Sequence, residues 1–220
     1  MRPLVDFLPF VLPLVPGCSD PMAEQAVLSA CIEFAGKSLI VQHTGTDNAV
    51  AGQTEYDVEQ PSQQILSKVL AVYYQDRRLK ARAREMVRSG YAARGEAIPG
   101  VDTYSGTPIE WFCRNPAEAI VSIYPAPAEA AADALTIVGA YAPTRNATRV
   151  ADILYTDYAE DIAAGAVAQL LIVPAQPFTN PALRKPYRDR FDAAMHSAAN
   201  LARVGLGAAS SRVQPAFFAR

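Results

Sequence analysis

The sequence predicts an α+β fold in which a helical bundle is built from both chain ends, with an inserted antiparallel β domain and an extended C-terminal tail. Apolar residues recur every three or four positions near both ends, short β-branched and aromatic runs fill the middle, and glycine, alanine and serine dominate after residue 205. We therefore expect a helical bundle from residues 19–44 and 150–205, a β domain from 45–149, and a tail from 206–220.

Residues 1–18 are expected to form an extended N-terminal arm. Asp6 and four prolines interrupt their apolar run, and proline lacks the amide hydrogen that a helix needs. The arm is expected to pack on the folded body through Leu4, Phe7, Leu8, Leu12 and Leu14. A second interpretation is open, because a basic start, an apolar run and Cys18 also occur in exported, lipid-anchored binding proteins. Asp6 and the prolines count against it.

Three helices are expected in the two end regions. The first opens at Asp20-Pro21, where Asp20 can cap the helix and Pro21 fits the first helical position, and it runs to about Val41. The second is expected from Ile153 to Ile172. The third opens at Asn180-Pro181, again a capping residue followed by proline.

Six strands are expected in the β domain, because β-branched and aromatic runs there alternate with turn residues. They are Thr54–Val58, Ile65–Tyr74, Arg77–Lys80, Ile109–Cys113, Ala119–Ile123 and Leu135–Tyr141. A short helix is expected from 82–88, where helix formers gather. A loop is expected from 90–106, where glycine and polar residues are frequent.

The overall charge gives no sign of a nucleic-acid or membrane protein. The chain has 20 Lys and Arg against 22 Asp and Glu, a formal net charge of -2, so no global field draws it to polyanions. No apolar run approaches the roughly 20 residues that a membrane-spanning helix needs. We expect a soluble protein without membrane contact.

No catalytic or metal-binding motif stands out. His43 and His196 lie near the ends of different predicted helices without an acidic motif beside them. Asp157, Glu160 and Asp161 cluster, but in the first turns of a predicted helix, where its dipole favours negative charge. We expect no metal, no cofactor and no enzymatic activity; a hydrolase with a site hidden from sequence inspection stays as an alternative.

A basic run is the clearest candidate for contact with another molecule. It contains Arg77, Arg78, Lys80 and Arg82, and it can face phosphate or an acidic neighbour. We interpret it as a solvated or protein-facing strand edge, because Glu85 follows and the whole chain is slightly acidic. Aromatic residues also concentrate in the β domain. They can stack on bases, but core packing and protein interfaces are their commoner uses.

The order of several landmarks resembles one known family. The landmarks are Pro13-Leu14-Val15-Pro16-Gly17-Cys18 before the Asp20-Pro21 helix, Tyr56-Asp57-Val58, Lys68-Val69-Leu70-Ala71-Val72-Tyr73, Trp111-Phe112 near Ile120-Val121-Ser122-Ile123-Tyr124-Pro125, and Pro177-Phe178-Thr179-Asn180-Pro181 before Tyr187-Arg188-Asp189-Arg190-Phe191. Over nearly the whole chain they resemble the head-to-tail adaptor, or connector, proteins of tailed bacteriophages. The basic run and the 90–106 loop depart from that pattern.

The resemblance implies a structural virion protein that is made in the host cytoplasm and placed at the head-tail junction. Such adaptors form a ring, commonly of twelve copies, and DNA passes through it without sequence-specific binding. The implied partners are the portal protein, a tail or nozzle protein, and further copies of the chain. The residues implied in portal binding are Arg212, Phe217, Phe218 and Arg220. Those suggested for subunit or tail contacts are Arg77, Arg78, Lys80 and Arg82.

Overall fold

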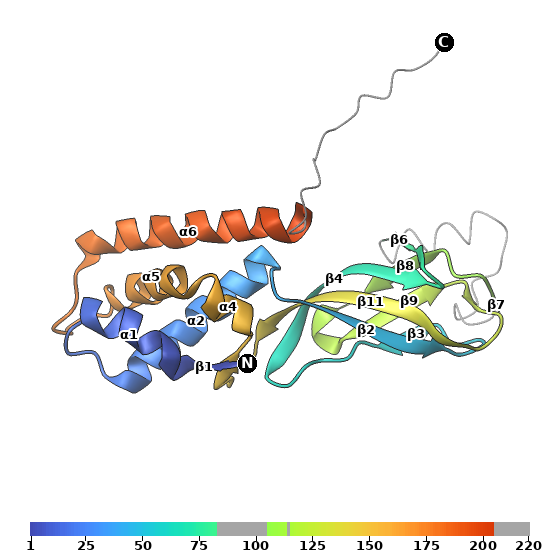
Figure 1. Cartoon of the computed structure of the whole chain (residues 1–220), viewed down its shortest axis with the longest axis horizontal. Coiled ribbons are helices and arrows are strands. Elements are labelled where there is room, and N and C mark those ends of the chain that lie inside the picture. Colours follow the sequence, from blue (N-terminus) through green and yellow to red (C-terminus); the bar gives the residue numbers. More distant parts are fainter. Residues whose placement is uncertain (83–104, 114, 205–220) are drawn as a thin grey trace, which may run out of the picture.

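The computed structural model describes residues 1–82, 105–113 and 115–204 and shows an elongated molecule with its helices in one half and most of its strands in the other (Figure 1). The α-helices of these residues are α1 (Leu8–Val11), α2 (Asp20–Ser38), α4 (Asp152–Thr156), α5 (Ala159–Leu170) and α6 (Pro181–Val204). The strands are β1 (Arg2–Pro3), β2 (Gln42–Ala49), β3 (Glu55–Asp57), β4 (Gln64–Tyr74), β5 (Arg77–Arg78), β6 (Lys80–Ala81), β7 (Ser105–Gly106), β8 (Glu110–Cys113), β9 (Ile120–Tyr124), β10 (Ala126–Pro127), β11 (Ala131–Pro143) and β12 (Arg149–Val150).

The fold is α+β, but the predicted helical bundle from both chain ends with one antiparallel insertion is wrong. Of the five α-helices in the described ranges, α1 and α4 have only four and five residues. Strands form about 31% of the structure and are divided among four sheets. Two of the strand pairs, β6 with β8 and β7 with β10, are parallel.

The prediction of an extended N-terminal arm is also wrong. Residues 4–14 form two 3-10 turns, Leu4–Phe7 and Leu12–Leu14, on either side of α1. Pro9 and Pro13 each stand in the first turn of a new helical segment, where a missing amide hydrogen costs no bond. Prolines at this spacing prevent one long helix but allow consecutive short turns.

The core side chains of this N-terminal segment differ in part from those expected. Leu4, Phe7 and Leu8 are buried as predicted, whereas Leu14 is 44% exposed. Val11 and Val15 are fully buried in its place. The reason is geometric, because a helical turn directs every third or fourth side chain to one side, while an extended chain alternates its side chains.

The longer helices α2, α5 and α6 pack on one another around two phenylalanines. Phe34 of α2 lies 5.8 Å from Phe191 of α6, measured between ring centroids, and both rings are fully buried. The ring of Tyr158, just before α5, also packs on Phe34, with 4.8 Å between the ring centroids. At Gly165 of α5, an added Cβ would lie 2.4 Å from the Phe191 ring. Only glycine lets α5 approach α6 this closely.

An ion-pair network joins α2 to α6 beside these rings. Arg188 donates to both carboxylate oxygens of Glu33, at 2.9 and 2.6 Å, and its Nε donates to Asp192 at 3.0 Å. Lys37 donates to Glu33 from one helical turn away, at 2.7 Å. These hydrogen bonds, Arg188 foremost, lower the pKa of Glu33 to about 2. The pair is bidentate and only partly exposed, the geometry in which Arg–carboxylate pairs are strong.

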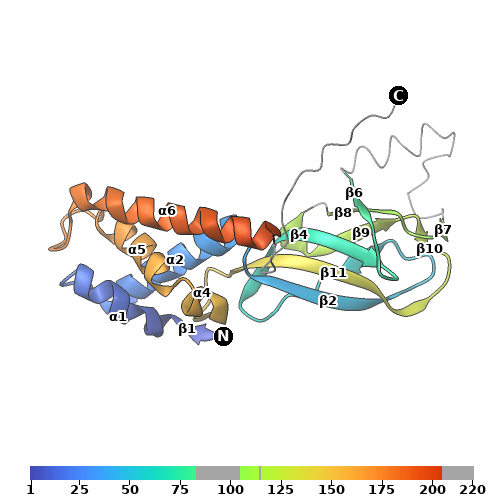
Figure 2. The same cartoon turned by 45° about the horizontal axis from the view of Figure 1, so that its top comes forward.

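Two four-stranded sheets form the β half, in the orders β2-β11-β4-β5 and β3-β9-β8-β6. Figure 2 shows β4, β11 and β2 side by side in the first of them. Inward side chains of both sheets, including Val72, Ile123 and Leu135, belong to one apolar cluster. Strand β4 matches its predicted range closely. Strand β2 was not predicted, because its sequence is polar and largely exposed and carries no alternation of apolar residues.

The predicted helix from Ile153 to Ile172 is divided in two. Helix α4 ends at Thr156 and α5 starts at Ala159, with Tyr158 between them turned into the core beside Phe34. The predicted starts of the other two helices lie within one residue of the observed starts of α2 and α6. The helix predicted from 82–88 and most of the 90–106 loop fall outside the described residues.

Substitution of Gly165 tests the close contact of α5 with α6. Gly165→Ala is expected to destabilise the protein by about 1–3 kcal/mol, because the new methyl group overlaps the Phe191 ring. Gly36→Ala on α2 is the matched control, since an added Cβ there meets nothing within 4 Å. That variant should be unchanged or slightly more stable. Equal effects of the two variants on urea unfolding would contradict this packing.

The Glu33 ion pair predicts a defined pH dependence of stability. Because folding lowers the pKa of Glu33 from 4.5 to about 2, its contribution is complete above pH 4.5 and is lost as the pH falls toward 2. At pH 7, Glu33→Gln should cost about 1–3 kcal/mol. The difference from wild type should shrink in urea titrations between pH 4.5 and 2. Glu24→Gln, on the same helix without an ion pair among the described residues, should show neither effect.

Candidate interaction site

A groove of about 550 Å³ lies at the side of the β half where residues 77–82 pass from one sheet to the other. Arg77 and Arg78 extend the first sheet by pairing with β4. After Leu79, Lys80 and Ala81 join the second sheet in parallel with β8. The Leu79 amide donates to the Val72 carbonyl at 2.8 Å, which fixes the crossing point. Residues 77–82 therefore form the outer strand of both sheets on this side.

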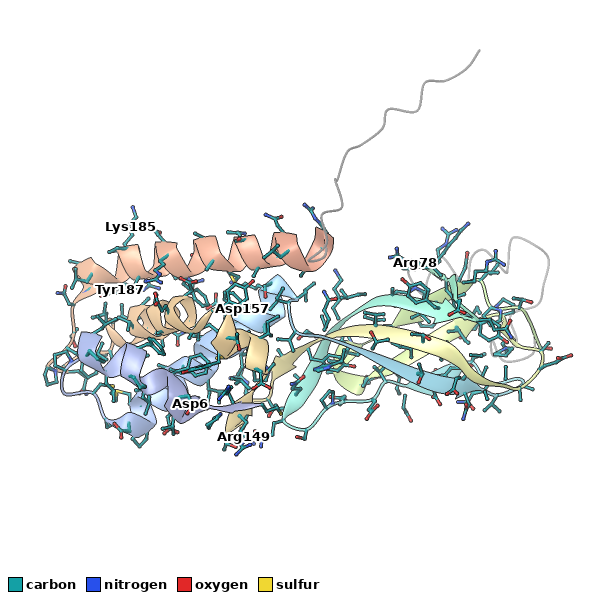
Figure 3. The ribbon with its side chains drawn as sticks, viewed as in Figure 1. Asp6, Arg78, Arg149, Asp157, Lys185 and Tyr187 are labelled. Atoms are coloured by element: carbon teal, nitrogen blue, oxygen red, sulfur yellow. The ribbon has the colours of Figure 1, made fainter. Side chains whose placement is uncertain are left out.

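The groove has an apolar floor and a cationic rim. Its floor includes Leu79 and Trp111, which are 3% and 7% exposed, and the half-buried Leu70. Its rim is formed by the exposed Arg78 and Lys80, together with Arg82. Figure 3 shows Arg78 on the outer side of the β half, away from the helices. A partner that binds here can pair with the cations of the rim and cover the apolar surface that Leu70 and Ala81 leave exposed.

The positive charge of this rim is only partly compensated within the chain. The Nε atom of Arg82 donates to Glu110 at 3.1 Å. Arg77, Arg78 and Lys80 have no carboxylate within ion-pair distance among the described residues. Exposed cations that lack an internal partner attract carboxylates or phosphates of another molecule. The groove is therefore the strongest candidate interaction site.

A second depression, of about 560 Å³, lies where Arg2 and Phe10 meet α4 and α5. Most of its charges are already paired, since Arg190 donates to Glu160 and to Asp161, each at 2.8 Å, and Arg2 pairs with Asp152; the exposed Asp157 has no ion pair among the described residues. These hydrogen bonds raise the pKa of Arg190. Glu160 and Asp161 stand in the first turn of α5, where the helix dipole stabilises negative charge. This arrangement has a structural explanation that needs no ligand.

The residues that enzymes commonly use for catalysis are dispersed in the structure. His43 pairs with Gln64 at 3.1 Å and packs on Tyr141, while His196 is exposed on α6. Burial raises the pKa of all three thiols, which disfavours the reactive thiolate. Within the described ranges, no group of three or more His, Cys, Asp or Glu residues is placed to hold a metal ion.

The predicted site residues divide into two groups. Arg78, Lys80 and Arg82 come together at the groove, and Arg77 adjoins them. Arg212, Phe217, Phe218 and Arg220, predicted to bind the portal, lie outside the described residues. Trp111 and Leu79 were not predicted as part of a site. Trp111 reaches it through the parallel pairing of β6 with β8, between segments about 30 residues apart, for which the sequence carries no local signal.

Comparison with protein-family models and with curated proteins gave no significant match. The resemblance to head-to-tail adaptors therefore depends on the sequence landmarks alone. Among the described residues, no helix combines the length and the apolar character that crossing a membrane requires.

Substitutions in the groove should separate its rim from its floor. Arg78→Gln and Lys80→Gln are expected to change the free energy of unfolding by less than about 0.5 kcal/mol, because both side chains are exposed. Trp111→Ala should cost about 3–5 kcal/mol, since the ring is buried in the apolar cluster. Thermal and urea unfolding measure both effects. A large loss in the rim variants would show that these cations serve the fold.

Proposed function

We propose that this chain is a structural virion protein, a subunit of the head-to-tail adaptor ring that joins the portal vertex to the tail and forms part of the DNA channel. The observation that carries the proposal is the groove with an apolar floor and a cationic rim, in which only Arg82 pairs with a carboxylate of the described residues. Such a surface suits a protein partner, because carboxylates of the partner can pair with the cations while the exposed parts of Leu70 and Ala81 are covered. The sequence landmarks supply the family.

The groove favours a protein partner over a nucleic acid. Single-stranded nucleic acids bind to exposed aromatic rings on which their bases stack. Trp111 and Tyr74 are each 7% exposed, and Tyr56 is 2% exposed, so these rings serve as core. The net charge of -2 is compatible with a channel that DNA crosses without adhering.

The elongated shape also supports an adaptor. The helical half and the β half lie at opposite ends of the long axis (Figure 1). A subunit of this form can contact one partner with one end and a different partner with the other, while its sides face neighbouring copies. Contacts with these partners and with neighbouring copies require only that the two surfaces that meet are complementary.

The lipid-anchored alternative receives no support from the packing. Cleavage before Cys18 would remove Phe7, Val11 and Val15, which are fully buried. The core of the helical half would then lose several large apolar side chains, and each loss would lower the free energy of unfolding by kilocalories per mole.

Immunogold electron microscopy of particles from the source tests the proposal. An antibody against this chain should label one capsid vertex, at the head-tail junction. Antibody absorbed with the purified protein is the control and should label nothing. Gold that is absent from particles and present on cell envelopes would overturn the adaptor proposal.

A further inference from the structure

We propose that neighbouring copies of this chain associate through opposite sides of their β halves, with an acidic edge of one copy docked on the basic groove of the next. The basic edge is residues 77–82 and the acidic edge is residues 42–59. The inference rests on the proposed ring and names the surfaces through which its copies would join.

The acidic edge carries four exposed carboxylates. They are Asp47 near the end of β2, Glu55 and Asp57 on β3, and Glu59 just after it. The segment contains no Lys or Arg. None of the four forms an ion pair with another described residue; Asp47 accepts a hydrogen bond only from the adjacent Asn48 amide, at 2.7 Å. Their charge is therefore available to a partner.

Sheet topology puts the two edges on opposite sides of the β half. In the first sheet, β2 and β5 are the two outer strands, and in the second sheet β3 and β6 are. In Figure 1, β6 lies on the upper side of the β half and β3 on the lower side. With strands about 4.8 Å apart, the outer strands of a four-stranded sheet are about 14 Å from each other. Each edge can thus bind a different neighbour.

The charges of the edges match in number and differ in sign. Residues 77–82 contain four cations, and residues 42–59 contain four carboxylates. Within the chain, Glu110 offsets one of the cations through Arg82, and the exposed Asp76 precedes the basic segment. The exposed parts of Leu70 and Ala81 beside the basic edge add a small apolar area that a neighbour can cover.

Charged edge strands have a second known use, which is to prevent aggregation. That use is best served by the same sign of charge on both edges, because copies then repel in every edge-to-edge arrangement. Opposite signs make the edges attract each other. Contact between two unlike edges of identical subunits is head-to-tail, and repetition of such a contact generates a ring or a filament.

Charge reversal tests the contact. One variant reverses the basic edge (Arg77→Glu, Arg78→Glu and Lys80→Glu), a second reverses the acidic edge (Glu55→Lys, Asp57→Lys and Glu59→Lys), and a third carries all six changes. Sedimentation velocity of the full chain should show wild-type self-association that weakens as salt rises. Either single-edge variant should associate more than about tenfold more weakly. A 1:1 mixture of the two, and the six-fold variant, should recover association.

Circular dichroism controls for folding, and glutamine replaces the reversed residue where a variant does not fold. Wild-type protein that stays monomeric at every salt concentration and at its highest soluble concentration would overturn the inference, as would single-edge variants that associate normally. If the single-edge variants associate normally and the antibody labels the head-tail junction, the edge contact is wrong and the adaptor proposal stands. If the charge-reversal variants behave as expected and the antibody labels another place, the adaptor proposal is wrong and the edge contact stands.

Discussion

The contact of Phe191 with Gly165 and Phe34 is the constraint on which the rest of the structure depends. It joins α6, near the end of the described chain, to α5 and to α2, near its beginning. The Glu33–Arg188 pair fixes the relative position of α2 and α6 beside the rings. Because β2 begins four residues after α2 ends, this packing also sets where the β half leaves the helical half.

The β half surrounds one apolar core and has outer strands on two opposite sides. The outer strands are β2 and β5 in one sheet and β3 and β6 in the other, and a continuous segment connects the sheets at each side. Strand β2 has eight residues, whereas the other three have only two or three. The buried alternate residues of these segments, such as Tyr56 and Leu79, hold them to the core. The remaining residues face solvent and can carry charge at little cost to the fold. The buried side chains of these strands thus stabilise the fold, while the exposed ones of the same strands are those that we propose to contact a partner.

Local patterns allowed much, but not all, of this structure to be predicted. Asn180-Pro181 located the start of α6, and the run of β-branched residues located β4, because both signals depend on adjacent residues. The predicted bundle was wrong because the spacing of apolar residues shows which face of a helix is buried but does not show where the helix breaks, as it does at Tyr158. Strand β2 lacked any apolar alternation. The rim of the groove could be predicted because its cations form one basic run in the sequence. The floor could not, because Trp111 reaches the groove only through the pairing of β8 with the distant strand β6.

The central proposal is that copies of this protein bind one another head to tail and fit between other proteins. Electron cryomicroscopy of the assembled wild-type protein tests that proposal most directly. The account predicts a closed ring in which residues 77–82 of each copy lie against residues 42–59 of the next. A ring held together only by the helical halves, with both β edges open to solvent, would contradict it.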